Sequence, residues 1–483
     1  MRDLCRNAVD DALAGGASYA DARTHERRSQ TVRTKAREVD SVADSETEGI
    51  GVRVLVDGAW GFASSPDLSP AGAREAASRA VEFARASSSR AGARARRTEL
   101  APTPPAHGEY RTPAGRDPVD VPLEDKIDLC LRAEEALERP GLALTSAFVR
   151  AQRERRAFAS SEGADALQEL CECGGGIEAL ALGDDGGVQT RSYPSAHGGS
   201  SAQAGWEYVE ELGLEREAPR VAEEALALLR AEPCPAGVTT IVLDSDQTGL
   251  QVHESVGHPT ELDRIYGTEA AYAGTSWVRA EDLGSLRYGS ELMNITADAT
   301  TPGGLGTFAW DDEGVPAARE PVVERGILAG FLTSRETAAR LGRGAGGSMR
   351  ADGWNRMPLV RMTNLHLEPG EGSLEELLAG VEDGIFMATN KSWSIDDKRL
   401  NFQFGTQVAW EIKKGKLGRL LRDPTYMGVT PEFWGRMDAV AGPGEWTMFG
   451  LTNCGKGQPG QHAHVSHGTS PARFRDVQVG VRS

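Results

Sequence analysis

The chain has 483 residues, of which 39% are apolar, and this is enough for two or three domains with cores of their own. Its 53 basic and 71 acidic residues give a net charge of −18, so the average surface field repels nucleic acid and anionic lipid. The one basic cluster, Arg90 to Arg97, lies in an Ala- and Ser-rich stretch without aromatic residues, which is typical of a solvated linker. We therefore expect no nucleic-acid partner.

Cysteine usage and the start of the chain indicate the compartment. The six cysteines, at positions 5, 130, 171, 173, 234 and 454, include no Cys-x-x-Cys pair, so we expect reduced thiols. The first residues run into an acidic amphipathic segment rather than a signal peptide, and no run approaches the roughly 18 apolar residues of a membrane span. These features predict a cytoplasmic protein without a membrane partner.

Residues 1–85 are predicted to form one α+β unit. Apolar residues recur at helical spacing from Leu4 to Leu13 and stop at Gly15-Gly16, which predicts an opening helix. A β-rich run over residues 50–64 is interrupted by Asp57-Gly58, a dipeptide that suits a two-residue hairpin turn.

A second helix and a linker follow. Ser69 is a natural N-cap and Pro70 fits the first helical position, so a helix is expected to begin there. From Ala86 the sequence is rich in Ala, Ser and Arg, and then contains three prolines between residues 101 and 105. We expect residues 86–116 to be a linker, because such a sequence does not build a packed element.

Residues 117–235 are predicted to form a middle α+β unit. Asp120 is expected to cap a helix that ends at Pro140, and a second helix is expected from Val221 to Arg230. The triple glycine 174–176 is expected to break two strands. The strand-like stretches are residues 145–160, 166–173 and 177–182.

Residues 236–483 are predicted to form a sheet-rich C-terminal domain, because many of the 57 glycines of the chain gather there. It opens with a β-branched strand over residues 239–244, followed by a turn and a helix. Residues 320–328 are expected to form a hairpin, and Ser373 with Glu376 forms a capping box for a short helix. The whole chain is thus expected to be a multidomain α+β protein.

The segment His253-Glu254-Ser255-Val256-Gly257-His258 places two imidazoles and a carboxylate within six residues. Zincins ordinarily carry His-Glu-x-x-His, one residue shorter. In a regular α-helix, which turns about 100° per residue, the two rings would point about 140° apart. A π-bulge, or a helix end at Gly257 ahead of Pro259, would bring them together. We predict a metal site here; the alternative is two unrelated histidines on a partly buried helix.

A third ligand is expected at Cys454. This cysteine lies in a glycine-rich stretch, residues 451–460, which predicts a loop whose backbone can approach a site closely. Lys456 and a bound metal would both favour the thiolate. The alternative is a small buried hydrophobic residue.

Residues 253–263, His-Glu-Ser-Val-Gly-His-Pro-Thr-Glu-Leu-Asp, resemble the metal-binding segment of the TldD/PmbA family of metallopeptidases. Other segments along nearly the whole chain resemble the same family in the same order. They are Gly49–Leu55 and Gly58–Ala63 for its N-terminal domain, Gln189–Pro194 for its middle domain, and Asp311–Gly314, Arg361–Asn364 and Asn453–Lys456 for its C-terminal domain.

The resemblance implies a zinc site with His253, His258 and Cys454 as ligands and Glu254 as the catalytic carboxylate. PmbA-type chains lack the histidine motif, so this chain resembles the TldD-like member. The resemblance also implies unfolded or modified peptides as substrates, and either a homodimer or a heterodimer with a PmbA-like chain as the working unit. Family members resemble two-chain assemblies, so a non-hydrolytic subunit that binds or presents peptides is an alternative function.

Three protein ligands leave zinc a fourth position for water, which is the arrangement of a catalytic site. The hypothesis is that Glu254 accepts the proton of that water and then donates it to the leaving amine of a cleaved peptide. A cysteine hydrolase with Cys454 as nucleophile and a histidine as base is a second alternative.

Three other groups of polar residues carry weaker functional signals. Asp311, Asp312 and Glu313 are expected to form a turn rather than a cation site, because Gly314 and Pro316 accompany them. Arg361 and Asn364 either position substrate or satisfy backbone groups. For His462, His464 and His467, a solvated C-terminal loop is favoured over a second metal site.

Overall fold

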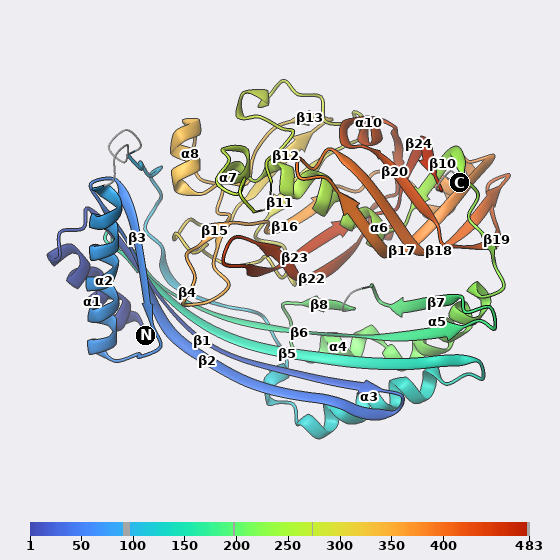
Figure 1. The fold of residues 1–483 in the computed structure, drawn as a ribbon, viewed down its shortest axis with the longest axis horizontal. Coiled ribbons are helices and arrows are strands. Elements are labelled where there is room, and N and C mark those ends of the chain that lie inside the picture. Colours follow the sequence, from blue (N-terminus) through green and yellow to red (C-terminus); the bar gives the residue numbers. More distant parts are fainter. Residues whose placement is uncertain (90–96, 197–198, 273, 481–483) are drawn as a thin grey trace.

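The computed structural model describes residues 1–89, 97–196, 199–272 and 274–480, so the predicted basic linker cluster lies, apart from Arg97, outside the described residues. The α+β class is confirmed. A long curved sheet runs along one side of the molecule, and a C-terminal body made of two larger sheets, a two-stranded sheet and short helices lies against it (Figure 1). In the described ranges, no helix is long and apolar enough to cross a bilayer. All six cysteines are free thiols, as predicted.

The curved sheet has the order β3-β2-β1-β5-β6-β4, with β7 and β8 also paired to β6. Helices α1 and α2 cover one end of it, and α3, α4 and α5 cover the other (Figure 1). The strands are β1 Tyr19–Lys35, β2 Glu38–Val56, β3 Ala59–Ser65, β4 His107–Arg111, β5 Leu142–Ser160, β6 Asp165–Leu182, β7 Val188–Tyr193 and β8 Ser200–Ala202. The helices are α1 Arg2–Ala14, α2 Pro70–Ser88, α3 Leu123–Leu137, α4 Glu207–Leu212 and α5 Leu214–Leu228.

Several local predictions for this half are confirmed. Asp57 and Gly58 join β2 to β3 with φ values of 51° and 77°, the positive dihedrals of the predicted two-residue turn. The Ser69 side chain accepts the N–H of Gly72 (3.2 Å) at the start of α2. Asp120, however, does not cap α3. Asp117 instead caps a short 3₁₀ turn at Pro118–Asp120, and α3 begins after Pro122.

The triple glycine does not break a strand, which corrects the prediction. Strand β6 runs through Gly174, Gly175 and Gly176. A Cβ on Gly174 would lie 2.2 Å from the carbonyl oxygen of Ser200, and one on Gly176 would lie 2.8 Å from the Cα of Gly199. The glycines are therefore required because β8 and the chain before it press against β6, a contact that local sequence does not reveal.

The predicted linker contains strand β4, which pairs in parallel with β6. An edge strand forms backbone hydrogen bonds with only one neighbouring strand. A polar segment that buries few apolar side chains can therefore still form one. Strands from residues 1–85 and 117–235 lie in this one sheet, with β1 paired to β5 along most of its length.

The C-terminal body contains a sheet of order β17-β10-β24-β20-β18-β19-β9, with β21 paired to β24, and a sheet of order β13-β12-β11-β16-β23-β22. Its first strands are β9 Glu232–Pro233, β10 Gly237–Leu243, β11 Ile295–Asp298, β12 Arg319–Glu324, β13 Ile327–Leu328, β14 Met349–Arg350, β15 Leu359–Val360 and β16 Asn364–Leu367. Its last are β17 Asp383–Ile395, β18 Asn401–Lys413, β19 Lys416–Arg422, β20 Thr425–Val429, β21 Met437–Val440, β22 Thr447–Lys456, β23 Gln461–Thr469 and β24 Ala472–Val479. The helices are α6 Ser245–Val252, α7 Leu262–Ile265, α8 Arg335–Leu341, α9 Leu374–Ala379 and α10 Thr430–Gly435.

The hairpin of β12 and β13 and the capping box of α9 are confirmed. The acidic run 311–313 forms the predicted turn, and it ties the C-terminal body to the curved sheet. Buried Glu313 accepts a hydrogen bond from Arg53 of β2 (2.9 Å), and Arg53 also binds Asp21 of β1. The Asp311 carboxylate accepts backbone N–H groups of Met349 and Val315, so it fixes the loop.

Candidate metal centre

Helix α6 delivers the histidines, and its geometry decides between the two predicted irregularities. The Asp244 side chain caps α6 by accepting the N–H of Gln247 (2.8 Å). A π-helical turn over His253–Gly257 follows directly, closed by the N–H of His258 bonding to the carbonyl of His253. This wider turn brings residues five apart onto one face. A Cβ at Gly257 would lie 2.3 Å from the sulfur of Met362, so glycine lets the π-turn lie against that side chain.

Cys454 lies in strand β22, not in the predicted loop. Opposite β23, Leu451 pairs with Val465 and Cys454 pairs with Ala463, so β22 has one extra residue between these pairs. Such a bulge re-aims a side chain. Gly455 lies within β22, while Gly457 and Gly460 lie in the turn that follows, so the glycines extend past the turn and the whole stretch resembles a loop in sequence.

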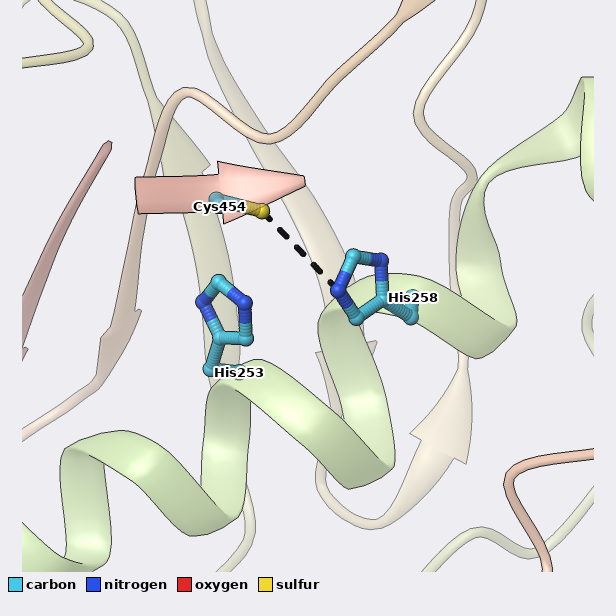
Figure 2. A group of neighbouring side chains, drawn as sticks. All are labelled: His253, His258 and Cys454. Carbon is cyan, nitrogen blue, oxygen red and sulfur yellow. Dashed lines mark hydrogen bonds between the residues drawn. The ribbon is translucent and has the colours of Figure 1, made fainter. Parts of the chain in front are cut away.

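The three candidate ligands converge. The two histidine side chains and Cys454 point toward one another from the helix and the strand (Figure 2). One donor atom from each lies within 4.8 Å of the other two, and all three residues are buried. Cys454 Sγ is 3.9 Å from His258 Nε2. Ligand atoms around a tetrahedral zinc ion lie roughly 3.5 Å apart, so small side-chain rotations would suffice for this set to bind one.

His467 orients His253, which sequence reasoning missed. Its Nε2 lies 2.8 Å from Nδ1 of His253, and its own Nδ1 lies 3.2 Å from the carbonyl oxygen of Leu365. A carbonyl only accepts, so the proton of His467 belongs on Nδ1, and Nε2 must accept from His253. His253 then carries its proton on Nδ1 and presents the lone pair of Nε2. Burial lowers the pKa of both rings, which favours these neutral forms.

The prediction of a solvated loop around these C-terminal histidines was wrong for His467, which is 1% exposed on β23. His464 lies on the same strand, where its Nδ1 is 2.5 Å from Glu172 of β6. His462 is exposed, and the alternation of side chains along β23 puts it on the opposite face from Ala463 and His467. The alternation of Ala463, Val465 and His467 was a strand signal that could have revealed the burial.

Glu261 orients the other histidine. Its carboxylate lies 3.2 Å from Nδ1 of His258, so it accepts that proton and leaves Nε2 free. Burial alone would raise the pKa of Glu261, but Lys456 at 3.2 Å and His258 hold it well below its usual range. Lys456 also binds Asp263 (2.8 Å). Lys456 therefore acts on Glu261, rather than directly on the Cys454 thiol as predicted.

The thiol is favoured as thiolate by a different cation. Burial tends to raise the pKa of Cys454, yet Arg361 and His258 together lower it below the ordinary thiol value. The Arg361 guanidinium also donates to the backbone carbonyls of Cys454 and Gln461. Of the two roles considered for Arg361, binding backbone groups is the one observed. Asn364 does the same, donating to the carbonyl of Asp298 (2.7 Å) and accepting from Gly306 (2.8 Å).

Glu254 lines the pocket that contains the three candidate ligands, and it is 5% exposed. Its carboxylate forms an ion pair with Arg399. Arg399 lies in the turn between β17 and β18 with a φ of 63°, a conformation that few non-glycine residues adopt. Nothing in the local sequence indicated this arginine.

Known proteins resemble this chain along its whole length. Family models described as PmbA/TldA metallopeptidase domain 1, central domain and C-terminal domain match residues 20–84, 116–231 and 236–481. A metalloprotease of Methanothermobacter thermautotrophicus is 30% identical over 463 residues, which are 96% of this chain and 95% of that protein. The chain belongs to the PmbA/TldD family of metallopeptidases. The resemblance found in its motifs is thereby confirmed.

Two further comparisons bear on this PmbA/TldD family member. A zinc metalloprotease TldD homolog of Saccharolobus solfataricus is 26% identical over 253 residues, 52% of this chain and 54% of that protein. The crystal structure of TldE from Thermococcus kodakarensis has the same fold, with a TM-score of 0.73 and 15% identity over 99% of this chain and 100% of that one. The first relative is named a zinc metalloprotease, and the second shows the fold alone.

Proposed function

We propose that this protein is a zinc-dependent metallopeptidase that hydrolyses peptide bonds in unfolded or modified peptides. In this proposal His253, His258 and Cys454 hold the ion and Glu254 is the general base. One observation carries the proposal: three soft or borderline donors from distant parts of the chain lie together, buried, with both imidazole tautomers set to present Nε2. Two imidazoles and a thiolate suit zinc, and a set of three leaves a position for substrate chemistry.

Bound zinc would supply Lewis acidity, which activates a water molecule and polarises a peptide carbonyl. The chain itself supplies proton transfer. Glu254 directly follows a ligand and lines the same pocket, so it is placed to accept a proton from the attacking water and to deliver it to the leaving amine. The ion pair with Arg399 orients this carboxylate before substrate arrives.

His467→Leu is expected to weaken zinc affinity by about 10- to 100-fold, the usual effect of removing a group that orients a metal-binding histidine. Leucine cannot accept the Nδ1 proton of His253, so this ring loses its fixed tautomer. His467→Gln places an amide oxygen on the same side and should recover much of the affinity. Zinc dissociation constants measured by competition with a chelating dye would show the difference.

His462→Leu is the matched control, because His462 is exposed on the same strand and should leave zinc affinity unchanged. The visible spectrum of the cobalt-substituted protein supplies a readout that a loss of stability alone would not produce. An unchanged cobalt spectrum and zinc affinity in His467→Leu would show that His467 has no role in orienting the ligand.

The proposed activity itself is tested by metal removal. A chelator should abolish cleavage of an unfolded peptide, such as reduced and alkylated casein, and added zinc should restore it. The cysteine-hydrolase alternative predicts the opposite pattern, with activity that survives chelation and is lost on thiol alkylation of the metal-free protein. The metallopeptidase proposal would be refuted if cleavage continued undiminished in protein that contains less than about one zinc ion per hundred chains.

The working unit is also a proposal. We propose either a homodimer or a pair with a PmbA-like chain, supported by the fold shared with TldE. Light scattering of the purified chain gives its oligomeric state. If the pure chain binds zinc and peptide but cleaves only after a second chain is added, that result would support the alternative of a non-hydrolytic subunit that binds or presents peptides.

A further inference from the structure

The pocket at the metal centre extends well beyond the candidate ligands, between α6 and β22. Along α6 and the first residue of the π-turn after it, Asp246, Leu250 and His253 follow one another at helical spacing and line the same side of the pocket. Along β22, Phe449 and Leu451 alternate onto the pocket face, and the bulge brings Cys454 onto that face too. On the helical wall, the apolar Leu250 lies one turn from the candidate ligand His253. On the strand wall, Leu451 lies three residues from Cys454.

The two ends of this pocket differ in character. At the far end, polar groups already satisfy one another, because Asp246 accepts from the hydroxyl of Ser195 (2.6 Å) and from the N–H of Asn390 (3.2 Å). Nearer the candidate ligands, the half-buried side chains of Leu250, Phe449 and Leu451 meet the same space. The pocket volume is about 260 Å³, so it accepts a single bulky side chain with some backbone rather than a folded partner.

An exposed aromatic residue extends the apolar surface outward. Trp393 of β17 is 42% exposed and also lines this pocket. A contiguous apolar patch that is rimmed by polar residues is typical of a ligand-binding groove, whereas single exposed apolar residues are not. Here the apolar surface is continuous with a candidate catalytic centre, and its two walls are held on regular elements rather than on mobile loops.

We infer that Leu250, Phe449 and Leu451 form a subsite for a bulky apolar side chain, such as Phe or Leu, of the substrate residue next to the cleaved bond. This inference rests on the proposed function, since it assigns a substrate class to the same site. An apolar side chain entering the subsite leaves water and contacts both walls, whereas an Ala in the same place leaves the space unfilled. Binding of the side chain also places the neighbouring peptide bond beside His253 and Cys454.

The test uses zinc-loaded protein and a series of quenched fluorescent peptides. The peptides share a sequence rich in Ser and Ala and differ only at one central residue, which is Phe, Leu or Ala. Cleavage sites are identified by mass spectrometry, so either side of the bond can be assigned. The expected result is cleavage next to Phe or Leu, with kcat/KM about 10- to 100-fold higher than for Ala, the effect of burying one large apolar side chain. In Phe449→Ala and Leu451→Ala this Phe-to-Ala ratio should fall by roughly fivefold or more.

Leu417→Ala is the matched control, because Leu417 is an exposed leucine on β19 outside the pocket, and the ratio should stay as in the native protein. A second measurement does not depend on hydrolysis: zinc-loaded Glu254→Gln protein should bind the Phe peptide at least tenfold more tightly than the Ala peptide. Cleavage without any apolar preference, together with equal binding of the two peptides, would overturn the subsite and leave the peptidase proposal standing. Tighter binding of the Phe peptide with no cleavage by native protein would support the subsite and count against the peptidase.

Discussion

Glu254→Gln is expected to keep its zinc and to lose peptide hydrolysis by roughly 10²- to 10⁴-fold, the usual contribution of a general base. Glutamine has nearly the same shape as glutamate but cannot take up a proton. Glu254 is buried beside the candidate ligands and is not one of the three converging donors, so the substitution separates chemistry from metal binding. Zinc content by elemental analysis and kcat on an unfolded peptide, measured on one preparation, give both quantities.

Glu134→Gln is a suitable control for the loss of a buried carboxylate. Glu134 of α3 is fully buried and accepts hydrogen bonds from Thr145 (2.8 Å) and the N–H of Arg37 (3.2 Å), in the part of the chain that packs on the curved sheet. We expect native zinc content and native kcat in this variant. Turnover in Glu254→Gln equal to that of the native protein would remove Glu254 from the mechanism, and loss of zinc would assign it to metal binding instead.

The sequence carried the residue types of the site but only part of its geometry. The spacing of His253 and His258 required an irregular helix, and either a π-bulge or an early helix end satisfied that requirement. The choice depends on what lies beside Gly257, and that neighbour is Met362, more than one hundred positions further along the chain. Local periodicity contains no information about such a contact.

The groups around the candidate ligands show the same limit. His467 seemed polar and loop-like from its neighbours, yet its burial comes from the parallel pairing of β23 with β16, in which His467 lies opposite Leu365. Arg399 reaches Glu254 from a hairpin turn, and Lys456 reaches Glu261 instead of the thiol. Each of these contacts joins segments that are far apart in sequence. The residue types therefore indicated a metal site, but which side chains contact one another depends on the tertiary structure.

Strand edges and close approaches explain the remaining differences. The hairpin turn at Asp57-Gly58, the helix caps at Ser69 and Ser373 and the strand before α6 were predictable because their signals span only a few residues. The run Gly174 to Gly176 was predicted wrongly because glycine in a strand pattern occurs both where a strand breaks and where another backbone approaches closely. Only the position of Ser200 against β6 shows that close approach is the reason here.

Cys454→Ala is expected to lower zinc affinity by on the order of 10²- to 10³-fold, if one ligand contributes about a quarter of the roughly 10–16 kcal/mol with which four-ligand zinc-finger sites bind zinc. Peptide hydrolysis should fall in parallel at limiting zinc. Cys454 lies on β22 while both histidines lie on the segment that follows α6, so a zinc ion would link two elements and its loss should also lower the thermal unfolding temperature of the zinc-loaded protein.

Cys130→Ala is the matched control, since Cys130 is a fully buried thiol of α3 without a role in the site. It should keep native zinc affinity and activity, which separates the loss of a ligand from the loss of a buried sulfur. The same pair of variants tests the thiol-nucleophile alternative, because a nucleophile that is not a metal ligand predicts that Cys454→Ala abolishes hydrolysis without changing zinc occupancy. Full zinc occupancy in Cys454→Ala at limiting zinc would therefore remove the sulfur from the ligand set, and the metallopeptidase proposal would then rest on the two histidines alone.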